Sequence, residues 1–216
     1  MKRPIALMIL LLAALHALNA GDKLFNPPAA NHARTYPAHE SHDDERVSIA
    51  IDPYDTADKA RTFKVNYQEK GFLPIRLIIS NDSDQTIVLS DLKIEYITAK
   101  RIKIEPATTD DIYRRLVRAN ADASSKKLQP PHSEDAKQAM AELEAAQFVP
   151  DSVGSHALRS GFLFFDISGI AVPEAGAHVY ITGLKTGGKE LFYFDIPLEK
   201  YLSHPPEKTE AKFVRV

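Results

Sequence analysis

Hydrophobic and polar residues alternate in short stretches along much of this 216-residue chain. Two stretches differ because they are apolar on both faces, and they run from Leu73 to Ile79 and from Gly161 to Ile167. A short strand with two apolar faces is typical of a position inside a sheet that is covered on both sides. We therefore predict that these stretches are the two central strands of a β-rich domain.

Shorter alternating stretches surround the central strands, and turn signals separate them. Asp52-Pro53, Asn81 to Asp84 and Gly187-Gly188 favour turns, because these residue types fix the backbone or tolerate turn dihedral angles. The further predicted strands are residues 47–51, 86–89, 92–98, 102–104, 179–182 and 190–198. Seven or eight strands separated in this way predict a mainly β protein, an immunoglobulin-like β-sandwich with Greek-key pairing.

The apolar positions of these strands also predict which side chains are buried. In the last strand, we expect Tyr193 to fill one side and Phe192 or Phe194 to fill the opposite side. The core is predicted to rest on Leu77, Ile79, Phe164 and Val179.

Residues 107–155 interrupt the strand pattern with two helical patterns. Thr108 to Asp111 favour the start of the first helix, and Ser133 favours the start of the second. Residues 120–131 between them have the composition of a linker, and we expect them to be mobile. An apolar stripe is costly to leave in water, so we expect both helices to pack on the sandwich or on each other. The apolar residues expected to be covered are Ile112, Leu116, Met140, Leu143 and Phe148.

The first residues of the chain predict export. Lys2 and Arg3 precede an apolar run from Ile5 to Leu18, and small residues follow it, which is the layout of a secretory signal peptide cleaved after Ala20. The run is shorter than the roughly 20 apolar residues that cross a bilayer, so we predict no transmembrane segment in the mature chain. The predicted organisation is a signal peptide at 1–20, a flexible N-terminal arm at 21–46, a β-sandwich domain at 47–202 with its two-helix insertion at 107–155, and a C-terminal tail at 203–216.

The composition narrows the class of protein further. The chain has no cysteine, which excludes both a disulfide framework and a lipid-bearing cysteine after the signal peptide. Its formal net charge is −2, and a near-neutral surface of mixed sign differs from the clustered basic face of a nucleic-acid-binding protein. We therefore predict a periplasmic or extracellular protein that binds no nucleic acid and needs no cofactor.

Three histidines of the N-terminal arm are the candidate metal ligands. His32, His39 and His42 lie near Glu40, and the spacing of His39 and His42 would bring both onto one side of a helical turn. A flexible arm holds no fixed geometry, and ordering it costs conformational entropy that a metal would have to offset. We predict that no specific metal site forms there, and metal capture by the arm remains an alternative hypothesis.

Aspartates near the first strand and in the central hairpin offer oxygen ligands for calcium. They are Asp52, Asp55 and Asp58, or the turn from Asn81 to Asp84. Neither run has the glycine and the distal glutamate of a helix-loop-helix calcium loop. Local hydrogen bonds explain an aspartate at a strand end, Asp55 as the N-cap of a predicted helical turn over residues 56–61, and the residues of the hairpin turn. We therefore predict no calcium site.

No sequence motif of useful specificity marks a catalytic site. Ser155-His156 lacks the Gly-x-Ser-x-Gly pattern that holds a nucleophile on a strand-to-helix turn. Asp166 and Asp195 would have to meet in space to act as a carboxylate pair, and both are explained as strand-end residues. We predict no catalytic residues.

The most basic segment of the chain is explained as the solvated side of a helix followed by a linker. It comprises Arg114, Arg115, Arg118, Lys126 and Lys127.

Four segments together resemble a group of uncharacterised bacterial exported proteins that have one immunoglobulin-like domain. The segments are Asp52 to Thr56, Gly71 to Ser83, Gly161 to Asp166 and Glu190 to Pro197, and the resemblance covers residues 47–202. These are strand and turn motifs. The resemblance therefore implies an immunoglobulin-like fold and export, and it implies no activity and no site residue.

Three functional hypotheses follow from the sequence. The preferred one is a non-catalytic exported β-sandwich that binds another envelope protein or a surface polymer, with recognition concentrated in the insertion at 107–155. The alternatives are an unrecognised hydrolase or metal-dependent enzyme with a site between sandwich and insertion, and metal capture by the histidine-bearing arm. An exposed aromatic or apolar patch would favour the first hypothesis, whereas a pocket with convergent polar groups beneath the insertion would favour an enzyme.

Overall fold

The structure, a computed structural model, describes residues 25, 27–120, 134–170 and 175–202. The predicted signal peptide, most of the linker between the two helices, and the C-terminal tail lie outside these residues. None of the described helices is long and apolar enough to cross a membrane.

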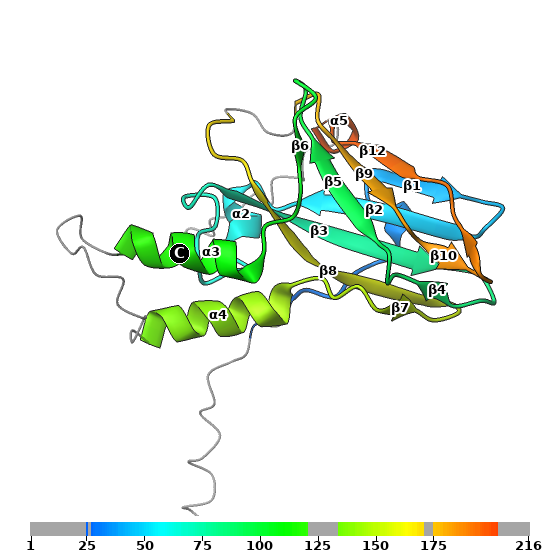
Figure 1. Ribbon diagram of the computed structural model, residues 1–216, viewed down its shortest axis with the longest axis horizontal. Coiled ribbons are helices and arrows are strands. Elements are labelled where there is room, and N and C mark those ends of the chain that lie inside the picture. Colours follow the sequence, from blue (N-terminus) through cyan, green and yellow to red (C-terminus); the bar gives the residue numbers. More distant parts are fainter. Residues whose placement is uncertain (1–24, 26, 121–133, 171–174, 203–216) are drawn as a thin grey trace, which may run out of the picture.

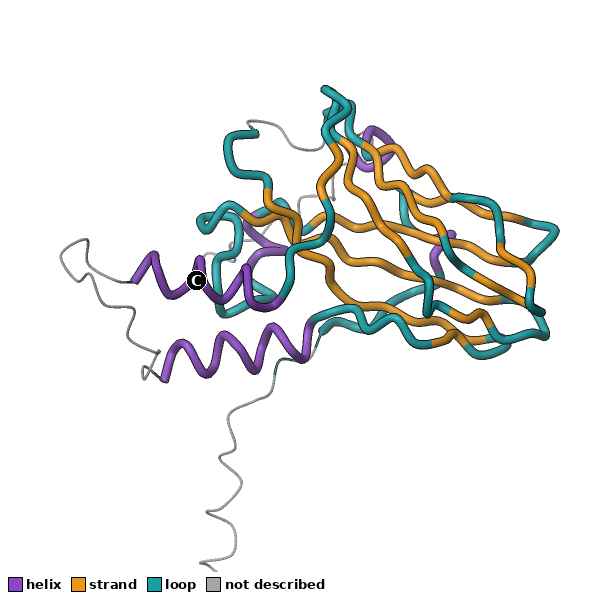
Figure 2. The backbone as a smooth tube through the Cα atoms, viewed as in Figure 1, coloured by secondary structure: helices purple, strands orange, loops and turns teal. Residues whose placement is uncertain are grey.

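The protein is mainly β, and its strands form three antiparallel sheets, as expected for a β-sandwich (Figures 1 and 2). Sheet 1 has the order β1-β2-β3-β8, with bounds His39–His42, Val47–Pro53, Phe72–Asn81 and Ala157–Asp166. Sheet 2 has the order β12-β9-β5-β6, with bounds Phe194–Pro197, His178–Thr182, Lys93–Ile97 and Lys103–Ile104. Sheet 3 has the order β11-β10-β4-β7, with bounds Lys189–Glu190, Lys185–Thr186, Ile87–Val88 and Ser152–Val153.

The described residues form twelve strands rather than the seven or eight predicted from the sequence. Four strands go beyond the eight predicted stretches: β1, β7, β10, and the one gained because residues 190–198 divide into β11 and β12. Strands β7 and β10 have two residues each, too few to show an alternating pattern, and β1 lies in the segment predicted to be a flexible arm.

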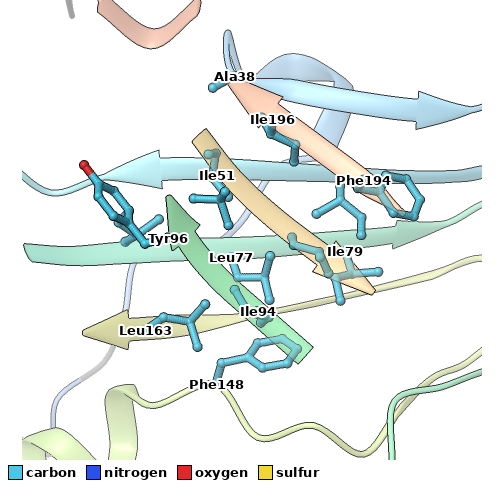
Figure 3. Packing of buried hydrophobic residues seen from close by; sticks show 14 of the residues in the cluster. Ala38, Ile51, Leu77, Ile79, Ile94, Tyr96, Phe148, Leu163, Phe194 and Ile196 are labelled. Carbon is cyan, nitrogen blue, oxygen red and sulfur yellow. The ribbon is translucent and has the colours of Figure 1, made fainter. Parts of the chain in front are cut away.

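The main hydrophobic core lies between sheets 1 and 2. Strand β3 contributes Leu77 and Ile79 from one side, and β5 and β12 contribute Ile94 and Phe194 from the other (Figure 3). The predicted core residues Leu77, Ile79 and Val179 are fully buried, and Phe164 is 1% exposed. The prediction of these four core positions is therefore confirmed.

Strand β3 is central, as predicted, because it pairs with β2 on one side and β8 on the other. The prediction that the second apolar stretch is also central in its sheet is wrong, because β8 is the last strand of sheet 1. Its outer edge is covered by main chain instead of a strand. The N–H of Phe148 donates to the carbonyl of Phe162 at 2.9 Å, and the N–H of Ala107 donates to that of Phe164 at 2.7 Å.

The two predicted helices are α3 (Thr109–Asn120) and α4 (Glu134–Ala146), which contact each other (Figure 1). Together with Phe162 and Phe164 of β8, their apolar residues form a second cluster on the face of sheet 1 that points away from sheet 2. The expectation that these helices pack on the sandwich is confirmed. The cluster comprises Tyr54, Phe63, Tyr67, Phe72, Ile112, Leu116, Ala139, Leu143, Ala146, Phe162 and Phe164.

A buried carboxylate fastens α4 to the loop that follows α2 (Ala57–Ala60). The side chain of Glu142 accepts the N–H of Lys64 at 2.6 Å and the N–H of Val65 at 3.3 Å, and it contacts the hydroxyl of Tyr67. Burial raises the pKa of Glu142, although the two backbone hydrogen bonds act in the opposite direction. Glu142 is therefore explained by its structural contacts.

The N-terminal segment differs from the flexible arm that the sequence predicts for residues 21–46. Ala33–Thr35 form a 3-10 helix, and β1 pairs with β2. The carbonyl of Pro28 accepts from Arg76 at 2.5 Å. The N–H of Ala33 donates to Ser80 Oγ at 2.9 Å. The prediction of a flexible arm is therefore wrong for residues 33–42, because β3 offers the segment hydrogen-bond partners and small apolar contacts that leave no periodic signal.

An ion pair fastens α3 to the end of β8. The guanidinium of Arg115 donates to both carboxylate oxygens of Asp166, at 2.9 and 2.5 Å, and lies 4.5 Å from the ring centre of Phe72. Hydrogen bonds from Arg115 hold the pKa of Asp166 well below its ordinary value. A carboxyl group whose pKa is lowered by folding stabilises the folded state at every pH above its pKa in the unfolded chain. This stabilisation is lost as the pH falls toward the lower pKa that the group has in the folded state.

We predict that Asp166→Asn lowers the free energy of unfolding at pH 7 by about 1 kcal/mol, the upper range for a half-exposed ion pair. The difference between the variant and the parent protein should shrink below pH 4, where the carboxylate begins to be protonated in the unfolded state. Urea unfolding at pH 7, 4 and 2 measures both effects. Asp110→Asn is the matched control, because Asp110 pairs with Arg114 on the same helix with both side chains 63% exposed, and it should cost less at pH 7. A pH-independent cost of Asp166→Asn would contradict the prediction.

Candidate binding surface

The outer face of sheet 2 carries polar and aromatic side chains in register. Val179 and Ile181 of β9 point into the core, so Tyr180 and its outward neighbours point the other way. The same alternation holds in β5 and β12. Strand pairing then aligns Asp195 with Tyr180 and Tyr180 with Glu95 in one row across the sheet. The next rows hold Pro197, His178 and Ile97 on one side, and Thr182 and Lys93 on the other.

Two exposed aromatic residues lie just before β12. The sequence predicts one strand over residues 190–198, but the chain leaves the strand conformation between β11 and β12. Leu191 and Phe194 are buried, whereas Phe192 is 77% exposed and Tyr193 is 53% exposed. The ring of Tyr193 lies 5.2 Å from that of Tyr180, with an angle of 31° between the planes. We call Tyr180, Phe192 and Tyr193 the aromatic patch.

The glycines that precede this segment form the predicted hairpin. Gly187 and Gly188 have φ angles of 54° and 78°, in the region that favours glycine, and they join β10 to β11. The hairpin returns the chain so that the N–H of Leu191 donates to the carbonyl of Leu184 at 2.8 Å. This turn therefore determines where the aromatic residues leave the sheet.

Acidic and basic side chains are balanced on this face. His178 Nδ1 lies 2.5 Å from Asp195 Oδ1, and Lys103 Nζ lies 2.7 Å from Glu95 Oε2. The positive charges of Lys93 and Lys103 balance the negative charges of Glu95 and Asp195. With histidine counted as neutral, the formal charge of these residues is zero. The face therefore has no electrostatic preference for a polyanion or a polycation.

Strand β1 of sheet 1 supports the edge of the surface. The N–H of Asp195 donates to Glu40 Oε2 at 2.6 Å, and the ring of His42 stacks on that of Phe194 at 3.9 Å. Lys200 Nζ donates to the carbonyl of His39 at 3.1 Å, and it belongs to α5 (Glu199–Leu202). These contacts between β1 and β12 hold the aromatic patch in place beside the sheet.

The candidate metal ligands of the N-terminal segment do not converge. His39 and His42 lie on a strand, where side chains three residues apart point to opposite faces, so their spacing does not act as it would in a helix. His39 Nδ1 lies 2.6 Å from the carbonyl of Tyr36, and His32 Nε2 lies 3.1 Å from both oxygens of Asp82. Within the described ranges, no three or more His, Cys, Asp or Glu residues are placed to hold one metal ion.

The candidate calcium ligands also have separate partners. Asp52 pairs with Lys59, and Asp58 pairs with Arg61 at 2.9 Å. Asp55 accepts from the hydroxyl of Tyr201 at 2.6 Å. The predicted role of Asp55 as an N-cap is wrong, because Thr56 caps α2. In the other run, Asn81 Nδ2 donates to the carbonyl of Gln85 at 2.7 Å, and Asn81 Oδ1 accepts the N–H of Ser83 at 3.0 Å.

The residues considered for catalysis are not brought together as a catalytic group. Ser155 Oγ donates to the carbonyl of Ser83 at 2.9 Å, while His156 Nε2 lies 2.8 Å from Asp84. Asp166 and Asp195 lie in different sheets and pair with Arg115 and His178. In the basic cluster, Arg114 pairs with Asp110 at 2.6 Å. Arg118, Lys126 and Lys127 lie outside the described side chains.

Sequence reasoning missed the aromatic patch, although a signal was present. Phe192, Tyr193 and Phe194 are consecutive, and a strand can turn at most two of them to one face. The expectation that Tyr193 and Phe192 or Phe194 fill opposite sides is correct only for the burial of Phe194. An aromatic run beside a glycine hairpin therefore identifies side chains that strand geometry leaves outside the core.

Neither a comparison with models of known protein families nor a comparison with curated proteins finds a match for this chain.

Proposed function

We propose that this protein is an exported, non-catalytic β-sandwich module of a bacterial cell envelope, and that it binds its partner through the aromatic patch. The exposure of Phe192 and Tyr193 carries the proposal. Apolar area left in water costs about 25 cal/mol per Å² relative to burial. Clustered exposed aromatic side chains are typical of interaction sites, because a partner can cover that area.

The fold that we propose is immunoglobulin-like. In that fold, strands A, B and E neighbour one another in one sheet, and strands C, F and G in the other. The order β2-β3-β8 is compatible with A-B-E, and the order β12-β9-β5-β6 is compatible with G-F-C with an added C′ strand. Strand β1 then extends the edge beside strand A.

Export is supported by the layout of residues 1–20 and by the resemblance described above. The sequence predicted partner binding by the insertion, but α3 and α4 use their apolar residues to cover sheet 1. We therefore assign partner binding to sheet 2. The hydrolase alternative gains no support from the interface between insertion and sheet 1. The described residues there form an apolar cluster, and the oxygens of Glu142 are hydrogen-bonded to the loop at Lys64 and Val65.

We predict that the mature chain binds washed bacterial envelopes saturably, and that replacing Phe192 and Tyr193 together by alanine weakens binding by about tenfold or more. Loss of two aromatic contacts, at roughly 0.5–1.5 kcal/mol each, corresponds to this change in affinity. Co-sedimentation of the labelled protein with the envelopes measures it.

Val149→Ala is the matched control, because Val149 is 60% exposed and lies outside the patch, between α4 and β7. This variant should bind as the parent protein does, and all variants should have the same unfolding midpoint within error. Binding that is not saturable, or that the double variant retains in full, would contradict the proposed function.

A further inference from the structure

We propose that the outer face of sheet 2 binds a neutral polysaccharide, with the aromatic patch stacking against the sugar rings. The inference rests on the proposed function and names the chemical class of its partner. It concerns Tyr180 and Tyr193 together with the polar residues that share their rows of the sheet.

The two tyrosine rings match the apolar faces of a sugar. A pyranose ring presents C–H groups on its faces, and aromatic rings attract such groups through their negative π-face. The ring centres of Tyr180 and Tyr193 lie 5.2 Å apart with a tilt of 31°, so the two rings contact each other and act as one aromatic unit on this face. Phe192, the residue before Tyr193 in the chain, is 77% exposed and is a further aromatic side chain that a ligand can reach.

The polar residues beside the rings match the hydroxyl groups of a sugar. A hydroxyl group both donates and accepts, so a sugar site needs donors and acceptors close together. Asp195 and Glu95 flank Tyr180 in its row, and Thr182 and Lys93 form the adjacent row. His178 lies in the row on the other side. Carboxylate acceptors, an ammonium donor and a hydroxyl group therefore lie next to the aromatic surface.

The charge balance favours an uncharged polymer. The two lysines and two carboxylates of the face cancel in formal charge, and Glu95 is paired with Lys103 within it. A polyanion such as a nucleic acid or an acidic polysaccharide gains binding energy from an excess of cations, which this face lacks. A neutral polysaccharide has no such requirement.

The same features argue against a protein partner. A stable protein interface buries about 800 Å² per partner and has a centre depleted in charged residues. Here charged side chains lie in the same rows as the aromatic rings, so the apolar area is narrow. Strands β5 and β9 lie across β2 and β3 with none of the described helices over them (Figures 1 and 2), so a polymer can cross the face.

Native affinity electrophoresis of the mature chain tests the inference. The neutral probes are hydroxyethyl cellulose, galactomannan and dextran, and alginate is the acidic probe. We expect retardation by at least one neutral polysaccharide and less by alginate. Tyr180→Ala combined with Tyr193→Ala should weaken binding by about tenfold or more, whereas Tyr193→Phe, which keeps the ring, should stay within about twofold.

Two results would overturn the inference. One is the absence of retardation by every neutral polysaccharide, and the other is retention of full binding in the Tyr180→Ala/Tyr193→Ala variant with an unchanged unfolding midpoint. If washed envelopes still bind through Phe192 and Tyr193 while no neutral polysaccharide does, the polysaccharide inference fails and the proposed function stands. If neither binds, both fail.

Discussion

Replacing Phe164 by alanine is expected to lower the free energy of unfolding by about 3–5 kcal/mol, the range for a buried phenylalanine. Phe164 is 1% exposed and lies in the cluster between sheet 1 and the helical insertion. Its ring centre is 4.7 Å from that of Tyr67 and 6.0 Å from that of Phe63. The truncation therefore removes a large apolar side chain and leaves a cavity among rings that relax only in part.

Urea unfolding followed by circular dichroism measures this cost. Phe192→Ala is the matched control, because it makes the same chemical change at a side chain that is 77% exposed. The control should cost less than about 0.5 kcal/mol, as surface substitutions usually do. Similar costs for the two variants would show that Phe164 does not hold the insertion on the sheet.

Replacing Lys59 by methionine is also expected to cost about 3–5 kcal/mol, because it leaves a buried carboxylate without its partner. Lys59 contacts Asp52, and the two side chains are 22% and 15% exposed. The ammonium group also donates to the carbonyl of Pro53 at 2.9 Å and lies 4.6 Å from the ring centre of Tyr201. Lys59 thus joins the end of β2 to α2 and α5.

The pH dependence of the variant follows from Asp52. Burial raises the pKa of Asp52 even though Lys59 and Arg76 both lower it, and Asp55 adds a small further rise. Removal of Lys59 should raise this pKa further. A carboxyl group whose pKa is higher in the folded state binds its proton more tightly there, so the variant should gain stability as the pH falls toward the ordinary pKa of 3.8.

A double variant separates the lost charge from the lost packing. Asp52→Asn combined with Lys59→Met removes both charges, and it should be more stable at pH 7 than Lys59→Met alone. Thermal or urea unfolding of the two variants at pH 7 and 4 provides the comparison. If Lys59→Met is as stable as the parent protein at pH 7, the pair does not contribute as described.

The sequence by itself determined those strands and helices in which apolar residues recur at the period of the element and mark its buried face. Leu77 and Ile79 alternate with residues of the other face of β3, and both faces are apolar because both are covered. The stripes with Ile112 and Leu143 likewise predicted α3 and α4 and their packing. Periodicity succeeds in these cases because a covered face must be apolar, whichever element covers it.

The identity of the covering element was decided only by the tertiary structure. Strand β8 has the same two apolar faces as a central strand, but main chain at Ala107 and Phe148 covers its edge. The N-terminal segment carries few large apolar residues, yet Arg76 and Ser80 fix its backbone across sheet 1. Backbone hydrogen bonds of this kind do not depend on the side chains of the segment that makes them, so its composition does not reveal them.

The candidate site shows the same division. The run Phe192-Tyr193-Phe194 supplied the aromatic residues, and the alternation of β12 required that not all of them could face the core. Which ones remain exposed depends on where the glycine hairpin ends and on Asp195, whose N–H donates to Glu40 of β1. Contacts between residues 155 positions apart in the chain therefore determine the aromatic patch, and local sequence patterns contain no information about such contacts.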